Sequence, residues 1–455
     1  MEKTIAAIST APAPGGIGIV RISGGEAFAV AEKVFRGVSG KKVSQMKGYT
    51  AQLGGAYTPG GEKLDDVVAL VYRGPKSYTG EDVVELSCHG GLYMTKRLLQ
   101  LVLDAGAAPA GPGEFTRRAF LNGKMDLAQA EAVMGLISAS GEQARKAALA
   151  GSTGVLSRKI ESIKQGLLEQ AAHLAAWADF PEEDVPQVEE AALLKGIRQG
   201  EKALEELLQG FDRGRMYREG LVTVIAGRPN AGKSTLMNLL SGCQRSIVTQ
   251  YAGTTRDVVE ETVMVAGVPL RLADTAGIRD TDDPVESIGV QAARQRLETA
   301  QLVLAVFDSS QALEKEDWEL MDALEKVPAI AIVNKSDLPT RMDVEAIQKR
   351  FEKTVSLSAA TGEGLAALEQ ALSEILDTKD FHPQEGVLFT QRQRMDAQTA
   401  LDSLREGEQA LALGLTLDAV TVCVEDALHA LAALTGEQVS EEIVDRVFEE
   451  FCVGK

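Results

Sequence analysis

From Leu221 to about Ala360 the sequence alternates between apolar runs of strand length and longer segments with helical periodicity. The strand-like runs read LVTVIAG, VPLRLADT, LVLAVFD, AIAIVNK and TVSLSA. Strands that alternate with helices in this way are typical of a sheet covered by helices on both faces. The pattern therefore predicts a doubly wound α/β domain, which we assign to residues 220–378.

The chain on either side of this domain differs from it in composition and in the spacing of its apolar residues. Residues 1–121 contain short β-rich runs, such as IGIVRISG and DVVELSCHGG, together with helical patterns, which predicts an α+β domain. Residues 122–219 and 379–455 are rich in Ala, Leu, Gln, Glu and Lys with apolar spacing near 3.6. Neither helical segment has an obvious core of its own. We therefore expect one discontinuous α-helical domain into which the α/β domain is inserted.

The composition narrows the class of protein. Of the 455 residues, 45% are hydrophobic and 25% are charged, as in a soluble globular protein. No apolar run approaches the roughly 20 residues that a membrane span needs, and no leader-like segment opens the chain, so we expect a cytoplasmic protein. The four cysteines are scattered without a CxxC pair, which argues against a zinc site or a disulfide framework.

The net charge of −19 is unevenly distributed. Residues 1–120 hold 14 basic and 11 acidic side chains, so the negative charge belongs to the rest of the chain. The overall charge of the protein would repel RNA, so an RNA partner would have to bind at a local patch of basic residues.

The segment GRPNAGKS, residues 227–234, fits the phosphate-loop pattern G-x-x-x-x-G-K-S between a predicted strand and a predicted helix. Backbone N–H groups of such a loop bind phosphate oxygens, Lys233 reaches the β- and γ-phosphates, and the Ser234 hydroxyl binds Mg²⁺. A chance Gly-rich turn in this context is improbable. The nucleotide contacts expected here are Asn230, Ala231, Gly232, Lys233, Ser234 and Thr235.

The segment NKSD, residues 334–337, ends the predicted strand AIAIV and is expected to select the base. The Asp337 carboxylate can accept two protons from guanine, whereas adenine offers no matching pair, so GTP is favoured over ATP. SAA follows the next strand, where a backbone N–H can meet the guanine O6. The expected contacts are Asn334, Lys335, Asp337, Ser358 and Ala359.

Two further segments follow the phosphate loop in the order that GTPases use. DTAG supplies a water-mediated Mg²⁺ contact and a γ-phosphate-sensing glycine, and GTTRD supplies Thr255 as a second protein ligand of Mg²⁺. Each could be an ordinary polar turn, but their order makes the chain a GTPase. The expected contacts are Asp274, Thr275, Ala276, Gly277, Thr249, Gln250, Tyr251, Ala252, Gly253, Thr254 and Thr255.

The hydrolytic machinery departs from the Ras pattern. Ile278 follows DTAG where Ras-like enzymes carry a water-orienting glutamine. Asn230 can offer its amide oxygen to a monovalent cation, which VTQYAGTT can wrap with carbonyl groups. Glu286 can orient water, although from the residues alone it is more simply a solvated charge.

All these motifs, together with the closing FCVGK, resemble the MnmE (TrmE) family of tRNA modification GTPases. GIGIVRISG, YTGEDVVELSCHGG, PGEFTRRAFLNGKMDLAQAEAV and DFPEEDV match that family too, so the resemblance covers essentially the whole length. It implies an N-terminal folate-binding and dimerisation domain, a helical domain and an inserted Ras-like G domain.

The resemblance also implies an activity. With the FAD-dependent partner MnmG, such proteins add an aminomethyl or carboxymethylaminomethyl group to C5 of the wobble uridine of certain tRNAs. The one-carbon unit comes from 5-formyl- or 5,10-methylene-tetrahydrofolate. The family forms homodimers through the N-terminal domain, and its GTPase cycle depends on K⁺ and on G-domain dimerisation.

The resemblance carries over to individual positions. It implies K⁺ at Asn230, Thr249, Tyr251 and Thr254, Mg²⁺ at Ser234 and Thr255, and Glu286 as the water-orienting carboxylate. It implies folate contacts at Arg21, Glu85, Lys124 and Lys455. Glu85 can accept hydrogen bonds from a pterin ring, and Arg21 and Lys124 suit carboxylates, but without the resemblance these would be surface charges. Ala13 and Pro14 depart from the family pattern before Gly15.

The chain closes on RVFEEFCVGK. Val447, Phe448 and Phe451 share one apolar face, which predicts that the last helix docks and fixes the CVGK tail. Gly454 allows the tail to bend toward the folate site. Cys452 then serves as a thiolate nucleophile or proton donor, for which it needs a cationic neighbour. The alternative is a frayed end with a chance cysteine.

Two other functions compete with this interpretation. A ribosome-assembly GTPase of the Era or EngA type, acting by RNA binding alone, shares the G motifs but has no place for the N-terminal domain or the FCVGK tail. A folate-dependent one-carbon transferase with a regulatory G domain is the second. Folate binding by residues 1–120 would argue against the ribosome-assembly GTPase. Loss of turnover in a Lys233 variant that still binds folate would argue against a G domain that is only regulatory.

Overall fold

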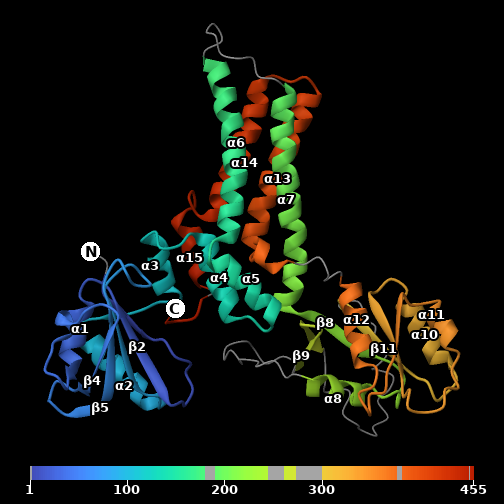
Figure 1. The fold of residues 1–455 in the computed structure, drawn as a ribbon, viewed down its shortest axis with the longest axis horizontal. Helices are drawn as coiled ribbons and strands as arrows, with labels where there is room; N and C mark the ends of the chain where they lie inside the picture. The colour runs from blue at the N-terminus through green and yellow to red at the C-terminus, as the bar shows by residue number, and fades with distance from the viewer. Residues whose placement is uncertain are drawn as a thin grey trace. The chain divides into compact units, whose positions relative to one another are not determined.

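The computed structural model describes residues 3–179, 190–243, 261–272, 300–376, 382–449 and 451–454. The chain forms two compact units (Figure 1). The first comprises Met1–Met134 with Glu425–Lys455, and the second comprises Gly135–Val424. In the part of the chain that is described, no helix is both long enough and apolar enough to cross a membrane.

A seven-stranded sheet in the order β3-β4-β5-β6-β2-β1-β7 forms the centre of the first unit. Neighbouring strands are antiparallel, except that β1 and β7 are parallel. The strands are β1 (Ile5–Ile8), β2 (Ile17–Ser23), β3 (Phe35–Gly37), β4 (Thr50–Tyr57), β5 (Lys63–Tyr72), β6 (Val83–His89) and β7 (Ala108–Pro109).

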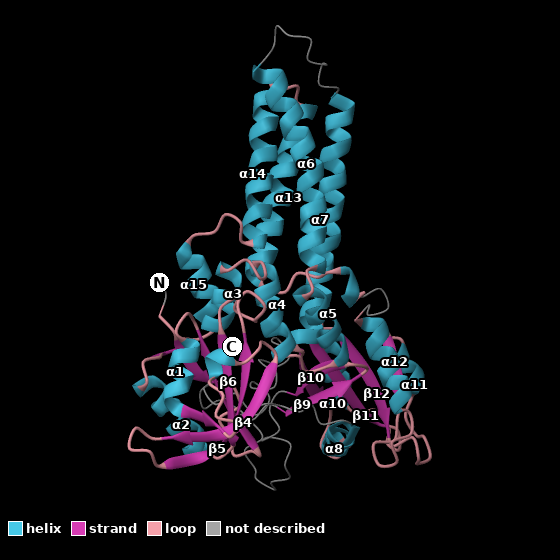
Figure 2. Ribbon diagram, turned by 60° about the vertical axis from the view of Figure 1, so that its left-hand side comes forward, coloured by secondary structure: helices cyan, strands magenta, loops and turns pink. Residues whose placement is uncertain are grey.

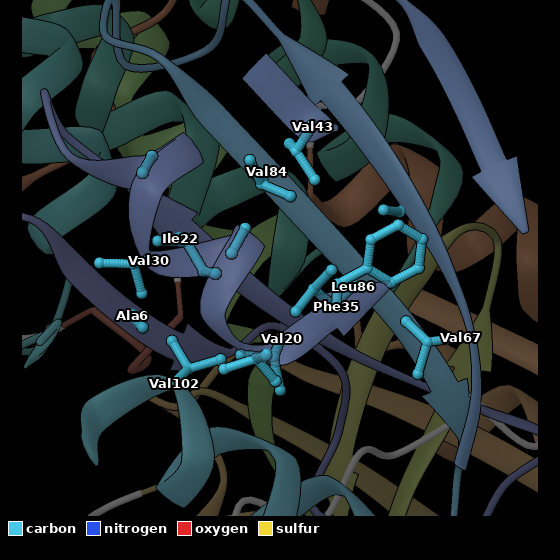
Figure 3. Close-up of a cluster of buried hydrophobic side chains, with 14 of the residues drawn as sticks. Ala6, Val20, Ile22, Val30, Phe35, Val43, Val67, Val84, Leu86 and Val102 are labelled. Atoms are coloured by element: carbon cyan, nitrogen blue, oxygen red, sulfur yellow. The ribbon is translucent and has the colours of Figure 1, made fainter. Parts of the chain in front are cut away.

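Helices cover this sheet unequally. Alternate residues of the strands, such as Val20, Val67 and Leu86, pack with α1 (Ala27–Val34) and α2 (Leu92–Asp104) in the cluster shown in Figure 3. Residues of opposite parity lie on the other face, where α3 (Glu114–Leu121) contributes Phe115 to a small cluster with Ile5 and Ala7. The predicted α+β domain is confirmed, and the second face of its sheet carries the candidate site.

The remaining elements of the first unit come from distant parts of the sequence. Residues of α4 (Leu127–Ile137) pack against α15 (Glu441–Glu449) through Leu127, Ala130, Val444 and Phe448. A single 3-10 turn, η1 (Val43–Gln45), lies beside α1.

Long helices dominate one part of the second unit, and Figures 1 and 2 show them running side by side. Apolar residues at helical spacing, such as Ile197 and Leu204 of α7 and Leu404 of α13, are fully buried. Because α7 precedes the α/β domain and α13 follows it, the predicted discontinuous helical domain is confirmed. The elements are α5 (Glu142–Ser152), α6 (Val155–Asp179), α7 (Glu190–Glu219), η3 (Pro383–Glu385), α13 (Gln391–Ala412) and the first part of α14 (Leu417–Thr435), whose residues from Glu425 on belong to the first unit.

The α/β domain has a six-stranded sheet in the order β13-β12-β11-β8-β10-β9. Its strands are parallel except for the edge strand β9, which the strand-like runs in the sequence did not reveal. The predicted doubly wound G domain is confirmed. The elements are β8 (Leu221–Ala226), α8 (Lys233–Cys243), β9 (Glu261–Val265), β10 (Val268–Leu272), β11 (Leu302–Asp308), α10 (Lys315–Ala323), β12 (Ala329–Asn334), α11 (Val344–Gln348), β13 (Lys353–Ser356) and α12 (Leu365–Ile375).

Candidate functional site

Three predicted GTP-binding segments lie within the described residues, GRPNAGKS, NKSD and SAA, and they meet at one edge of the G-domain sheet. Strands β8, β11, β12 and β13 are mutually parallel, so their carboxyl ends lie together. The phosphate loop, Asp308, the NKSD segment and Ser358 all follow these ends. This edge is where open α/β sheets bind ligands.

The backbone of the phosphate loop lies close to the Asn334 side chain, and this contact restricts the conformation of the loop. Gly232 has a φ of 98°, and a Cβ atom there would lie 2.1 Å from the Asn334 Nδ2 atom. Asn230 is exposed with a φ of 60°, a conformation that asparagine tolerates better than most residues. Ala231 is buried, and Ser234 and the exposed Thr235 lie in the first turn of α8. Glycine is therefore required at position 232 for the loop to pack against Asn334.

Neutral carbonyl groups hold the Lys233 ammonium group. Its Nζ donates to the carbonyl oxygens of Gly227 at 2.8 Å and Arg228 at 2.7 Å. Burial lowers the pKa of Lys233. No carboxylate pairs with Lys233 among the residues that the structure describes, so its charge suits an anionic ligand such as a phosphate.

Asn334 ties the base-binding segment to the phosphate loop. Its Nδ2 donates to the Ala231 carbonyl oxygen at 2.8 Å, and its Oδ1 accepts from the Ala359 N–H at 3.0 Å. The side chain is 1% exposed, so both bonds are sheltered from water. The side-chain amide of Asn334 therefore holds the phosphate loop, the NKSD segment and the SAA segment together.

Ser358 orients the predicted guanine-binding carboxylate. The Ser358 hydroxyl donates to Asp337 Oδ1 at 2.6 Å, and the Asp337 side chain is otherwise exposed. A carboxylate that is fixed through one oxygen can still accept hydrogen bonds through the other.

Asp308 and Ser309 support Lys335 but were not among the predicted residues. Lys335 Nζ forms an ion pair with Asp308 Oδ2 at 2.7 Å, and Ser309 Oγ donates to the Lys335 carbonyl oxygen at 2.9 Å. Burial acts to raise the pKa of Asp308, but hydrogen bonds from Lys335 and Ser310 outweigh it, so the net shift is downward. The position of Asp308 at the end of a strand that parallels AIAIVN was the available signal.

The structure pairs two of the four predicted folate residues, Arg21 and Glu85, with each other. Arg21 on β2 and Glu85 on β6 are direct cross-strand partners, and Arg21 Nε lies 2.9 Å from Glu85 Oε1. Their side chains are 19% and 15% exposed. The Arg21 guanidinium carbon also lies 5.4 Å from the Phe115 ring centroid and 6.0 Å from that of Tyr78. The result is a partly buried donor–acceptor pair beside aromatic rings.

Lys124 lies against the loop that carries Tyr78. Its Nζ donates to the Pro75 carbonyl oxygen at 3.0 Å, and Asn122 Nδ2 donates to the Thr79 carbonyl oxygen at 2.7 Å. Within the described residues, Lys124 is not hydrogen-bonded to Arg21 or Glu85. Tyr78 was not among the predicted site residues. Burial raises the pKa of its hydroxyl group, and the hydrogen bond with Thr116 and the charge of Arg21 offset only part of this rise.

The C-terminal tail is docked within the first unit. Phe448 and Phe451 are buried, with ring centroids 4.9 Å apart. Beyond them the Cys452 carbonyl oxygen accepts from the Gly113 N–H at 3.3 Å, and Val453 forms a β-bridge with Pro112. The predicted docking of the tail is confirmed, and Cys452 is half-buried.

Comparisons with known proteins agree along the whole chain. A family model described as the GTP-binding protein TrmE N-terminus matches residues 4–124, and one described as the MnmE helical domain matches residues 127–452. A tRNA modification GTPase MnmE of Symbiobacterium thermophilum is 45% identical over 457 residues, which covers 100% of both chains. Proteins of the same name from Alkaliphilus oremlandii and Lactiplantibacillus plantarum are each 42% identical and cover 100% and 99% of this chain, and 100% and 98% of their own lengths. The chain belongs to the MnmE family of tRNA modification GTPases.

Family membership confirms the resemblance found in the sequence. It also confirms the predicted enzyme class, a GTP hydrolase involved in tRNA modification. Individual site residues of this MnmE-family chain stay predictions. Several lie outside the described residues: Thr249, Gln250, Tyr251, Ala252, Gly253, Thr254, Thr255, Asp274, Thr275, Ala276, Gly277, Glu286 and Lys455.

Proposed function

We propose that this chain hydrolyses GTP in a K⁺-dependent cycle and, with an FAD-dependent MnmG partner, modifies C5 of the wobble uridine of certain tRNAs. The product carries an aminomethyl or carboxymethylaminomethyl group. The working units are residues 1–121, the helical segments 122–219 and 379–455, and the G domain 220–378. We propose the cytoplasm as its location.

The observation that carries the proposal is the contact between the tail and Arg21. The Gly454 carbonyl oxygen lies 3.4 Å from Arg21 Nη1, while Arg21 Nε pairs with Glu85. The residue pair that we propose for folate binding is thus in contact with the segment that bears Cys452. A GTPase that acts only as a binding switch has no evident use for this arrangement.

The residues present suit a tetrahydrofolate derivative, which would supply the one-carbon unit when bound. A pterin edge has adjacent donors and acceptors, which Glu85 and Arg21 can match as a pair, and Lys124 suits a carboxylate of the glutamate tail. In this proposal Arg21 and Glu85 orient the ring, and the tail excludes water from one side. Cys452 serves as nucleophile or proton donor.

At the G-domain site, Lys233 and the phosphate loop bind the phosphates, and Asp337 selects guanine. Mg²⁺ is held by Ser234 and Thr255, and K⁺ by Asn230, Thr249, Tyr251 and Thr254. Glu286 orients the attacking water.

A second copy of the chain is the proposed partner of exposed apolar residues on the sheet face that bears Arg21 and Glu85. Leu53 and Val68 are register partners on the face that bears Arg21 and Glu85, and their side chains are 57% and 39% exposed. Ile17 on the same face is 64% exposed. Exposed apolar side chains grouped on one face favour association. We therefore propose a homodimer through the N-terminal domain.

Nucleoside mass spectrometry of tRNA tests the proposed function. A strain that lacks the gene should lose the modified wobble uridine, and restoring the gene should return it. Unchanged tRNA in the deletion strain would contradict the proposal and favour the ribosome-assembly GTPase.

A further inference from the structure

The carbonyl group of Gly454 accepts two hydrogen bonds from the N-terminal sheet region. Ser9 Oγ donates to it at 3.1 Å and Arg21 Nη1 at 3.4 Å. The Ser9 backbone is itself fixed, because its N–H donates to the Ile19 carbonyl oxygen at 2.8 Å. The hydroxyl group therefore reaches the tail from a rigid position beside β2.

Only glycine can occupy position 454 in the docked tail. Gly454 has a φ of 96°, and a Cβ atom there would lie 2.2 Å from the Ile8 carbonyl oxygen. That contact is with backbone, so a side chain could not be accommodated by a simple rotamer change. The tail backbone therefore lies too close to the end of β1 for a side chain to fit between them.

Among the described residues, few other contacts hold the segment that follows Phe451. They are the bridge between Val453 and Pro112 and the hydrogen bond from the Gly113 N–H to the Cys452 carbonyl oxygen. The Val453 side chain is 57% exposed and so adds little apolar burial. The hydrogen bonds to Gly454 are thus a large share of what fixes this segment.

We propose that Ser9 and Gly454 form a latch that fixes the position of Cys452, which makes Ser9 a positioning residue. The latch also links the tail to Arg21, because one guanidinium group binds both Glu85 and the Gly454 carbonyl. A ligand that draws Arg21 away from this carbonyl leaves Ser9 as the remaining side-chain donor. The role of the latch in modification rests on the proposed function, whereas its existence does not.

Alkylation of Cys452 by iodoacetamide, followed by peptide mass spectrometry, measures docking directly. In the full-length Ser9→Ala variant the tail loses one hydrogen bond, so we expect Cys452 to react about fivefold faster. Ser9→Thr keeps a hydroxyl group and should stay closer to the wild-type rate. Ser403→Ala is the matched control, because Ser403 Oγ also donates to a backbone carbonyl, of Thr399 at 3.0 Å, but within α13.

Cys88 provides an internal control for unfolding of the first unit, since its side chain is 5% exposed. Its alkylation should stay slow in both Ser9 variants, so that faster reaction at Cys452 reports local release of the tail. Gly454→Ala should release the tail more completely than Ser9→Ala and increase the Cys452 rate about tenfold or more.

The same variants connect the latch to activity. Wobble-uridine modification should fall in Ser9→Ala and further in Gly454→Ala, while Ser403→Ala matches the wild type. Equal Cys452 rates in wild type, Ser9→Ala and Gly454→Ala would overturn the latch. If wild-type protein itself restores no modification, the proposed function fails, and the alkylation rates still decide the latch on their own.

Discussion

Each of the two candidate sites contains a partly buried cation, but the protein compensates the two charges differently. Lys233 in the G domain is held by two neutral carbonyl groups. Arg21 in the first unit is held by the Glu85 carboxylate, with the Gly454 carbonyl as a further acceptor. An uncompensated buried cation gains more from an arriving anion than a cation that already has a carboxylate partner.

The difference indicates what each site can bind. Lys233 suits an anionic phosphate, in agreement with its place in the phosphate loop. Arg21 would have to share or give up Glu85 to bind a carboxylate, so the pair is better suited to a neutral edge that donates and accepts hydrogen bonds. The expectation from sequence that Arg21 meets a carboxylate is therefore less favoured than joint recognition of a pterin ring.

The largest effect should follow from removing the Lys233 cation, which has no carboxylate partner among the described residues. Lys233→Ala should lower kcat/KM for GTP hydrolysis about 100-fold or more, because the stabilisation of phosphate charge is lost. Folate binding should be unchanged, since Arg21 and Glu85 belong to the other unit. Lys315→Ala is a matched control: Lys315 is also in the G domain, but its side chain is 89% exposed. Near-normal hydrolysis by Lys233→Ala would refute the assignment of the phosphate site.

Exchange of K⁺ for Na⁺ at fixed ionic strength should affect the GTP site but not the folate site, so it distinguishes the two without a mutation. We expect kcat for GTP hydrolysis to fall about tenfold, which is about 1.4 kcal/mol of transition-state stabilisation. The reason is the proposed role of Asn230 in binding a monovalent cation, together with the side chain of Ile278, which cannot orient water by hydrogen bonding. Binding of 5-formyltetrahydrofolate should be the same in both salts. Equal rates of GTP hydrolysis in K⁺ and in Na⁺ would contradict the proposed K⁺ dependence.

Neutralising Glu85 should make the Arg21 site resemble the Lys233 site. In Glu85→Gln the charge of Arg21 is no longer compensated and one carboxylate acceptor is lost. We expect 5-formyltetrahydrofolate to bind about tenfold more weakly by calorimetry with the full-length chain, or about 1.4 kcal/mol. Glu62→Gln, at an exposed turn between β4 and β5, is the control. An unchanged Kd would exclude the pair from the folate site.

Sequence alone predicted the parts of both sites that follow from local pattern. Strand–helix alternation and GRPNAGKS were enough for the G-domain fold and for the region of Lys233. The apolar face of Val447, Phe448 and Phe451 was enough to predict a docked tail. Each of these features depends on residues close together in the chain.

Partners that come together only through the tertiary structure were not predictable. The pairing of Arg21 with Glu85 depends on the register of β2 with β6, and Ser9 meets Gly454 across 445 positions of sequence. Asp308 was missed for the same reason, because its partner Lys335 follows the neighbouring strand β12. Periodicity shows which face a residue occupies, but it does not show which residue lies opposite.

The last expected effect is on stability rather than on activity, and it concerns Asp308, a buried carboxylate of the G domain that is paired with the Lys335 cation. Asp308 is 5% exposed and pairs with Lys335, so Asp308→Asn should lower the free energy of unfolding of the G domain by about 1–3 kcal/mol at pH 7. Asp322→Asn is the control, because the Asp322 side chain is 65% exposed in its ion pair with Arg350 and such pairs contribute little. Urea titrations monitored by Trp318 fluorescence in a Trp177→Phe background would measure both.

The pH dependence of this difference follows from the direction of the Asp308 shift. Its pKa in the folded protein is lower than in the unfolded chain, so the carboxylate stabilises the fold fully above the unfolded value of about 4. As the pH falls through the lower folded value, Asp308 becomes protonated and this contribution disappears. Wild type and Asp308→Asn should therefore differ by a constant amount above about pH 5 and converge in acid. A difference that persists unchanged well below pH 4 would mean that the variant disturbs packing rather than the ion pair with Lys335.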